Sequence, residues 1–163
     1  MYSTGVAVYI TIAITQENKL SVRLLIFMTL TATSAITSAA TLKSENELRP
    51  FVESVMVKVG LNDLDGAFKA IHPFVVISDS EFQSAVLSSK SQREQYGSRY
   101  GKAVGYECID QKKVGEFLVR ILCVEKTERH AMPWNFYFYK SPKGWVLNSF
   151  TWNDQLPAIF NLK

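Results

Sequence analysis

The chain has 163 residues, of which 47% are hydrophobic, and its formal net charge is +3. This length and composition predict one globular domain. The small net charge, without a basic face or run, excludes the charge pattern expected of a nucleic-acid-binding protein.

The N-terminal segment has the layout of a secretory signal peptide. Basic residues Lys19 and Arg23 precede an apolar run at residues 24–36, and small residues follow it at 37–40. A basic region, a short apolar run and a small-x-small end are typical of such signals, and they place cleavage before Thr41. A buried core helix is the alternative interpretation of the run.

The apolar run is too short to span a bilayer, which needs roughly 20 apolar residues. We therefore predict a signal peptide at residues 1–40 and a single exported domain at residues 41–163, periplasmic or secreted, with no stable membrane anchor after cleavage. Residues 1–18 fall outside the usual signal layout, and we interpret them as an over-extended start of the reading frame.

Two helices are predicted at the start of the domain. Residues 44–47 have the form of a capping box, and the apolar positions that follow are spaced for one buried helix face that ends at Gly60. A second, short helix begins after residues 62–63 and stops at Pro73. The inward positions of these helices are Leu48, Phe51, Val52, Val55, Met56 and Val59, then Leu64, Ala67, Phe68 and Ile71.

A third helix follows a second capping box at residues 78–81. It runs to Tyr100, either continuously or with a break at residues 88–89. Residues 74–77, which precede it, are expected to form a strand or an extended link. The remaining chain predicts strands at residues 103–110 and 117–126 and then a hairpin, so helices precede an antiparallel meander in an α+β order.

The hairpin spans residues 134–152 and is the clearest strand signal. A four-residue loop at 141–144 places Lys140 opposite Trp145, and alternation then sorts the side chains into two faces. One face is purely apolar and is assigned to the helices: Trp134, Phe136, Phe138, Trp145 and Leu147. The other face mixes polar-tipped residues with apolar ones: Asn135, Tyr137, Tyr139, Val146, Asn148, Phe150 and Trp152.

The strand at residues 117–126 is apolar on both faces, which is typical of a central strand covered twice. The helices can cover one face, and a second copy of the same sheet can cover the other. The sequence therefore predicts a homodimer formed through the sheet, with Tyr139, Asn148 and Trp152 at the dimer interface.

Cys108 and Cys123 are the only cysteines and lie on successive predicted strands. A two-residue turn at 114–115 puts Cys108 opposite Ile121 and Cys123 opposite Tyr106, so the two thiols sit diagonally. This register favours two buried free thiols. A disulfide would need a register shifted by two residues.

The order of these elements, with residues 62–68 (Asn-Asp-Leu-Asp-Gly-Ala-Phe) and 144–147 (Gly-Trp-Val-Leu), resembles the nuclear transport factor 2-like superfamily, also called SnoaL-like or cystatin-like. The resemblance covers roughly residues 48–153. It implies a conical fold, with helices packed on a curved antiparallel sheet, a pocket between them, and frequent dimers through the outer sheet face. It implies no particular reaction, because the superfamily includes enzymes, carriers and non-catalytic partner proteins.

Arg120 and Glu107 are the best candidates for a ligand site. An arginine amid apolar strand residues needs a partner, and Glu107 lies on the neighbouring strand. One interpretation is a structural ion pair. The other is a pocket pair that holds an anionic or carbonyl-containing ligand, helped by Tyr96, Tyr106 or Tyr137. For the domain as a whole, the predicted ligand is a small apolar or carbonyl-containing molecule.

Metal binding is not indicated, because His72 and His130 are the only histidines and neither has a partner at ligand spacing. We predict no cofactor and no catalytic residue. The preferred hypothesis is a non-catalytic binding or interaction module with a cone-shaped cavity. The alternative is a small isomerase- or dehydratase-type enzyme, in which Glu107 acts as base and Arg120 or a tyrosine polarises a carbonyl group.

Overall fold

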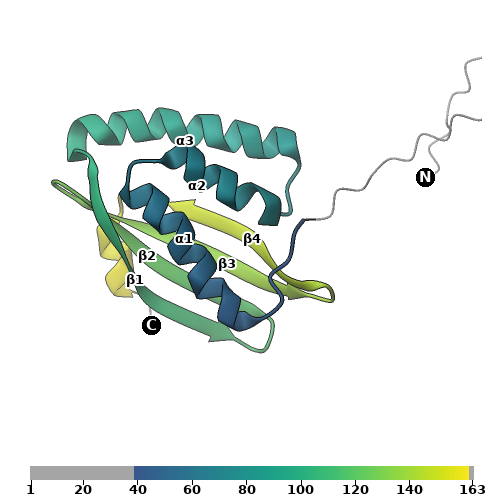
Figure 1. Ribbon diagram of the computed structural model, residues 1–163. Coiled ribbons are helices and arrows are strands. Elements are labelled where there is room, and N and C mark those ends of the chain that lie inside the picture. Colours follow the sequence, from purple (N-terminus) through teal and green to yellow (C-terminus); the bar gives the residue numbers. More distant parts are fainter. Residues whose placement is uncertain (1–38, 162–163) are drawn as a thin grey trace, which may run out of the picture. The chain divides into compact units, whose positions relative to one another are not determined.

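The computed structural model describes residues 39–161, in which helices come first and an antiparallel sheet follows (Figure 1). The predicted α+β order is confirmed, while the predicted signal peptide lies almost wholly outside the described residues. The helices are α1 (Leu48–Gly60), α2 (Leu64–Ile71) and α3 (Asp79–Tyr100), with 3₁₀ turns η1 (Glu45–Glu47), η2 (His72–Phe74) and η3 (Leu156–Asn161). The strands are β1 (Ala103–Val114), β2 (Leu118–Thr127), β3 (Ala131–Ser141) and β4 (Gly144–Trp152), hydrogen-bonded in that order.

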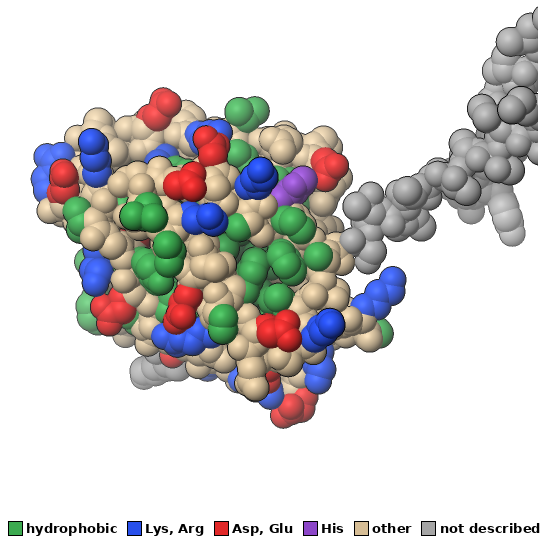
Figure 2. Space-filling model, viewed as in Figure 1, with side chains coloured by type: hydrophobic (Ala, Val, Ile, Leu, Met, Phe, Trp, Pro, Cys, Tyr) green, Lys and Arg blue, Asp and Glu red, His purple; other side chains and the backbone are tan. Residues whose placement is uncertain are grey.

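The helices cover one face of the sheet, which is called the helix face. The apolar sides of α1 and α2 pack there against large aromatic residues of β3, and Trp134 and Phe136 are fully buried. These rings fill the middle of the layer where the resemblance implies a pocket. Figure 2 shows hydrophobic side chains gathered over the middle of the helix side, with charged side chains around them.

Helix α3 is continuous through Ser88 and Ser89, so no break occurs there. The predicted capping box at its start is confirmed: Ser78 Oγ accepts from the backbone N–H of Glu81, and the Glu81 carboxylate accepts from the backbone N–H of Ser78. Only Phe82 and Val86 of this long helix are buried among the described residues. The helix therefore has a fully formed N-cap but buries few side chains against the rest of the domain.

We expect Ser78→Ala to lower the free energy of unfolding by about 1 kcal/mol at pH 7, the usual cost of losing an N-cap. Hydrogen bonds from the Ser78 side chain and backbone lower the pKa of Glu81. Their contribution to stability is therefore present above the unfolded pKa of Glu81 and is lost as the pH falls through the lower folded pKa. Urea unfolding should show a smaller difference between the two proteins at pH 3 than at pH 7, and an equal difference would contradict this assignment.

The hairpin of β3 and β4 has the predicted register at its loop, with Lys140 opposite Trp145. A bulge then intervenes, because Phe138 pairs with Leu147 but Tyr137 pairs with Ser149. The extra residue, Asn148, shifts everything after it to the other face. The prediction that Phe150 and Trp152 share a face with Tyr137 is therefore wrong: both lie on the helix face, opposite Phe136 and Trp134 respectively.

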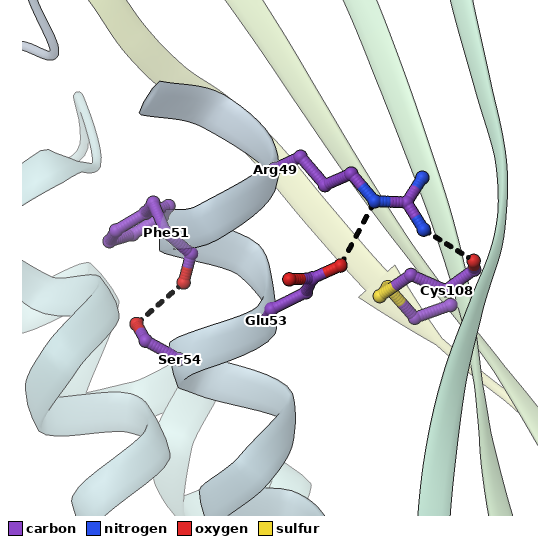
Figure 3. Close-up of a disulfide and its surroundings, with 6 residues drawn as sticks. Arg49, Phe51, Glu53, Ser54 and Cys108 are labelled. Atoms are coloured by element: carbon purple, nitrogen blue, oxygen red, sulfur yellow. Dashed lines mark hydrogen bonds and ion pairs between the residues drawn. A yellow bond between two sulfur atoms is a disulfide. The ribbon is translucent and has the colours of Figure 1, made fainter. Parts of the chain in front are cut away.

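Cys108 and Cys123 form a disulfide, so the preference for two free thiols is wrong. A three-residue turn at 115–117 replaces the expected two-residue turn, and a register shift follows Cys108, so the two cysteines lie directly opposite. Figure 3 shows the disulfide beside α1, where Arg49 Nη2 donates to the backbone oxygen of Cys108 at 2.8 Å. The bond thus joins β1 to β2 where α1 also contacts the sheet. Disulfides are typical of exported proteins.

The face of the sheet away from the helices, called the outer face, is only partly covered. The C-terminal segment turns back across it, since Asn153 donates to the backbone oxygen of Pro133 and η3 packs against β3. Leu122 is buried on this face, whereas Leu118 on the same strand is 39% exposed. The central strand β2 is therefore covered twice only along part of its length. No helix within residues 39–161 is long and apolar enough to cross a membrane.

Candidate functional site

A groove of about 390 Å³ lies between helix α3 and the edge strand β4. Its volume falls in the range of small-molecule sites, which is roughly 300–1,000 Å³. The helix forms one wall, the last residues of β4 form the floor, and the link before α3 closes one end. The lining residues are Val75, Ile77, Ala85, Ser88, Ser89, Gln92, Asn148, Ser149, Phe150, Thr151 and Trp152.

The groove exists because of the side chains that α3 turns toward β4. Ala85, Ser88, Ser89 and Gln92 are spaced i, i+3, i+4 and i+7, so they form one helix face. A helix packed tightly on a sheet carries large apolar residues at such positions. Here they are small or polar, and space remains between the helix and the strand.

Aromatic packing positions the floor of the groove. Trp152 stacks on Trp134 with ring centroids 5.6 Å apart, and Tyr96 of α3 meets Trp152 edge-on at 5.7 Å. Phe150 stacks on Phe136 at 6.5 Å. These contacts follow from the bulge at Asn148, which places both floor residues on the helix face. The floor is thus a rigid apolar surface supported by the core.

A buried ion pair fixes α3 to the sheet next to this floor. The guanidinium of Arg93 binds both carboxylate oxygens of Glu125 on β2, and Trp134 Nε1 donates to Glu125 at 3.0 Å. The Glu125 side chain is 0% exposed and that of Arg93 is 14% exposed. Arg93 also lies 5.9 Å from the centre of the Trp152 ring. Both carboxylate oxygens of Glu125 accept hydrogen bonds from Arg93, and one of them also accepts from Trp134. This carboxylate is therefore a structural group.

The groove's chemistry is that of an uncharged binding site. Its floor is apolar, and hydroxyl and amide groups at Ser88, Ser89, Gln92 and Asn148 can donate to a carbonyl oxygen. No acid, base or cysteine is among the lining residues of the described chain. Acid–base catalysis in this groove would need a group that its lining does not supply.

Three of the predicted ligand residues lie on the outer face. Arg120 sits opposite Tyr137, and both line a hollow of about 220 Å³ there. Arg120 pairs with Asp110, not with Glu107 as predicted, because the register shift after Cys108 brings Asp110 to the right height. Glu107 instead lies 3.6 Å from Lys126 and is well exposed. The prediction of an Arg120–Glu107 pair is therefore wrong.

The other predicted residues divide between the two faces. Tyr96 and Tyr106 lie on the helix side, so the five residues proposed for one ligand site are not brought together. Tyr139 lies on the outer face and is 41% exposed. Asn148 and Trp152, predicted at a dimer interface, both line the groove, and Asn148 also lines a hollow with Tyr139. The interface itself stays a prediction.

The two histidines have structural partners. His72 Nε2 lies 3.0 Å from Asp79 Oδ1, and His130 Nε2 lies 3.0 Å from the backbone oxygen of Asp154. Desolvation, together with a hydrogen bond to Asp154, raises the pKa of Tyr100, which stacks on His130. Tyr100 therefore remains a donor at neutral pH. Within the described residues no group of three potential metal ligands is found.

No protein family, curated protein or solved structure matches this chain. The assignment of the groove as a candidate site therefore rests on its geometry alone. The helix wall of the groove was not predicted from the sequence, since Ser88 and Ser89 there indicate only a place where the helix could break. The signal that could have found it was the small, polar i, i+3, i+4, i+7 face of α3.

Proposed function

We propose that this chain is an exported, non-catalytic binding module of the nuclear transport factor 2-like kind, which holds a small, uncharged, carbonyl-containing ligand in the α3/β4 groove. The observation that carries the proposal is the groove's combination of an apolar floor at Phe150 and Trp152 with neutral donors along α3. Apolar surface supplies affinity, and a few placed donors fix orientation. Helices followed by a four-stranded antiparallel meander, together with a disulfide, support the superfamily and the export.

Binding is favoured over the alternative of an isomerase or dehydratase. That hypothesis needs Glu107 in an apolar cavity, whereas Glu107 lies on the outer face beside Lys126. The buried carboxylate near the groove, Glu125, is already occupied by Arg93 and Trp134. A carboxylate held in this way is a poor base toward a ligand.

We also propose that the module is a homodimer formed through the outer face. Leu118, Tyr137 and Tyr139 are partly exposed there. The face carries acidic residues on β1 (Glu107 and Asp110) and basic residues on β2, including Lys126. Because a two-fold axis brings a patch against itself, exposed apolar residues with both signs of charge suit a second copy of this chain.

Native mass spectrometry of the chain, expressed with its own N-terminal segment and purified from a periplasm, tests both proposals. We expect a dimer mass with one additional small mass per subunit. Ser88→Trp fills the groove and should remove the adduct while the dimer remains. Leu87→Trp, at a neighbouring exposed position outside the groove lining, is the matched control and should keep the adduct.

Tyr139→Glu places a charge on the outer face and should give monomers that retain the adduct. An adduct of equal mass and occupancy in the Ser88→Trp protein would overturn the groove assignment. Absence of any adduct on the wild-type protein, with no binding of the neutral apolar dye Nile red, would overturn the proposed function. A wild-type monomer would overturn the dimer alone.

A further inference from the structure

Strand β4 is an edge of the sheet, and its outer edge is used only in its first half. Leu42 exchanges both backbone hydrogen bonds with Trp145, at 2.9 and 2.8 Å, and Val75 forms a parallel bridge with Leu147. Beyond Leu147, no backbone group among the described residues pairs with the outer edge of residues 148–152. This open edge borders the floor of the α3/β4 groove.

An open strand edge with backbone donors and acceptors is a template for another strand. Proteins usually protect such edges with charged side chains, and the opposite edge strand β1 follows this rule. Its second half carries Asp110, Lys112 and Lys113, and a register shift interrupts it after Cys108. Residues 148–152 carry no charge (Asn-Ser-Phe-Thr-Trp), and after the bulge at Asn148 their pairing with β3 is regular.

The groove leaves room for a backbone beside this edge. The wall opposite is made of the short side chains Ala85, Ser88 and Ser89, which allow a chain to approach. None of the groove's lining residues is charged, so an uncharged segment is the electrostatic match. Val75 already lies beside β4 at one end of the groove, and an added strand would continue the same row of backbone pairing.

We infer that the small ligand of the groove is a short, extended, uncharged peptide, which adds as a fifth strand to the outer edge of residues 148–152. Backbone hydrogen bonds to β4 hold the segment, and alternate apolar side chains rest on Phe150 and Trp152. The peptide carbonyl groups are the acceptors for the donors along α3. This inference rests on the proposed function, because it names the ligand class of the same groove.

The test is selection from a display library of random seven-residue peptides against the full chain, with the Ser88→Trp and Leu87→Trp proteins in parallel. We expect enriched peptides that lack charge and alternate apolar residues. They should bind the wild-type and Leu87→Trp proteins alike and bind the Ser88→Trp protein at least tenfold more weakly.

Each enriched peptide is then synthesised with its backbone amides N-methylated at alternate positions, in both phases. Strand addition requires that methylation in one phase abolishes binding and that methylation in the other does not, because only one set of amides faces β4. Hydrogen exchange of the backbone amides of residues 148–152 should slow when the unmethylated peptide is bound.

Binding that is insensitive to methylation in either phase, or that leaves exchange at residues 148–152 unchanged, would overturn strand addition. A library that yields no peptide dependent on the open groove would do the same. If the adduct seen by native mass spectrometry persists in either case, the groove still binds a small ligand and only the peptide inference fails.

Discussion

Arg93→Met is expected to lower the free energy of unfolding by about 3–5 kcal/mol, because it leaves the fully buried Glu125 carboxylate without its cation. Within residues 39–161, Trp134 Nε1 would remain as the hydrogen-bond donor to this carboxylate. A loss of this size is a large share of the roughly 5–15 kcal/mol that stabilises a typical domain. Urea unfolding followed by tryptophan fluorescence measures it.

The double variant Arg93→Met, Glu125→Leu removes both charges and should recover most of that loss, since replacing a whole buried pair is far less costly than breaking it. Lys90→Met, one turn earlier on α3, breaks an exposed pair with Asp65 and should cost less than about 1 kcal/mol. Should the double variant be as unstable as the single one, the ion pair would not be the reason for the loss.

Replacing both cysteines, Cys108→Ala with Cys123→Ala, is expected to cost about 3 kcal/mol. The disulfide joins residues separated by 15 positions, and closing a loop of that length lowers the entropy of the unfolded chain and so raises its free energy by about this much. Equilibrium unfolding of the oxidised wild-type and double-alanine proteins measures the difference. Dithiothreitol should destabilise the wild-type protein and leave the variant unchanged, whereas equal stability of the oxidised proteins would contradict the assignment.

The helices could be predicted from the sequence because their signals are local. The capping box at residues 78–81 and the apolar spacing of α1 each depend on residues within one or two turns. The hairpin loop at 141–144 was predictable for the same reason. Its Pro and Gly residues fix the turn, and the register near the turn follows.

The errors come from two irregularities within strands. The bulge at Asn148 and the register shift after Cys108 each change which residues face each other, and neither has a clear local signal. One displaced residue moved Trp152 to the helix face. The other shift, together with a longer turn, brought the cysteines together and gave Arg120 a different partner. A one-residue change in register reverses the face of every later side chain.

The ion pair beside the groove could not be predicted for a different reason. It joins Arg93 and Glu125, which are 32 residues apart and belong to different kinds of element. In the sequence, Glu125 comes directly before the charged segment at residues 126–129. It therefore has the sequence context of an exposed residue. Such a long-range pair depends on how α3 crosses the sheet. The sequence around either residue gives no sign of that crossing.

The light packing of α3 has a consequence for how the molecule moves. Helix α3 has 22 residues, yet only two of its described apolar side chains are buried, both in its first half, and its buried ion pair lies further along. Segments with few buried contacts open at lower free energy than the rest of a domain. Helix α3 is therefore the part of the described chain best suited to separate from β4 for short periods while the disulfide-linked sheet stays intact. If α3 moves away from β4, the groove can admit a bulky ligand that a rigid groove would exclude. The binding free energy is then reduced by the cost of ordering α3 again each time the ligand binds.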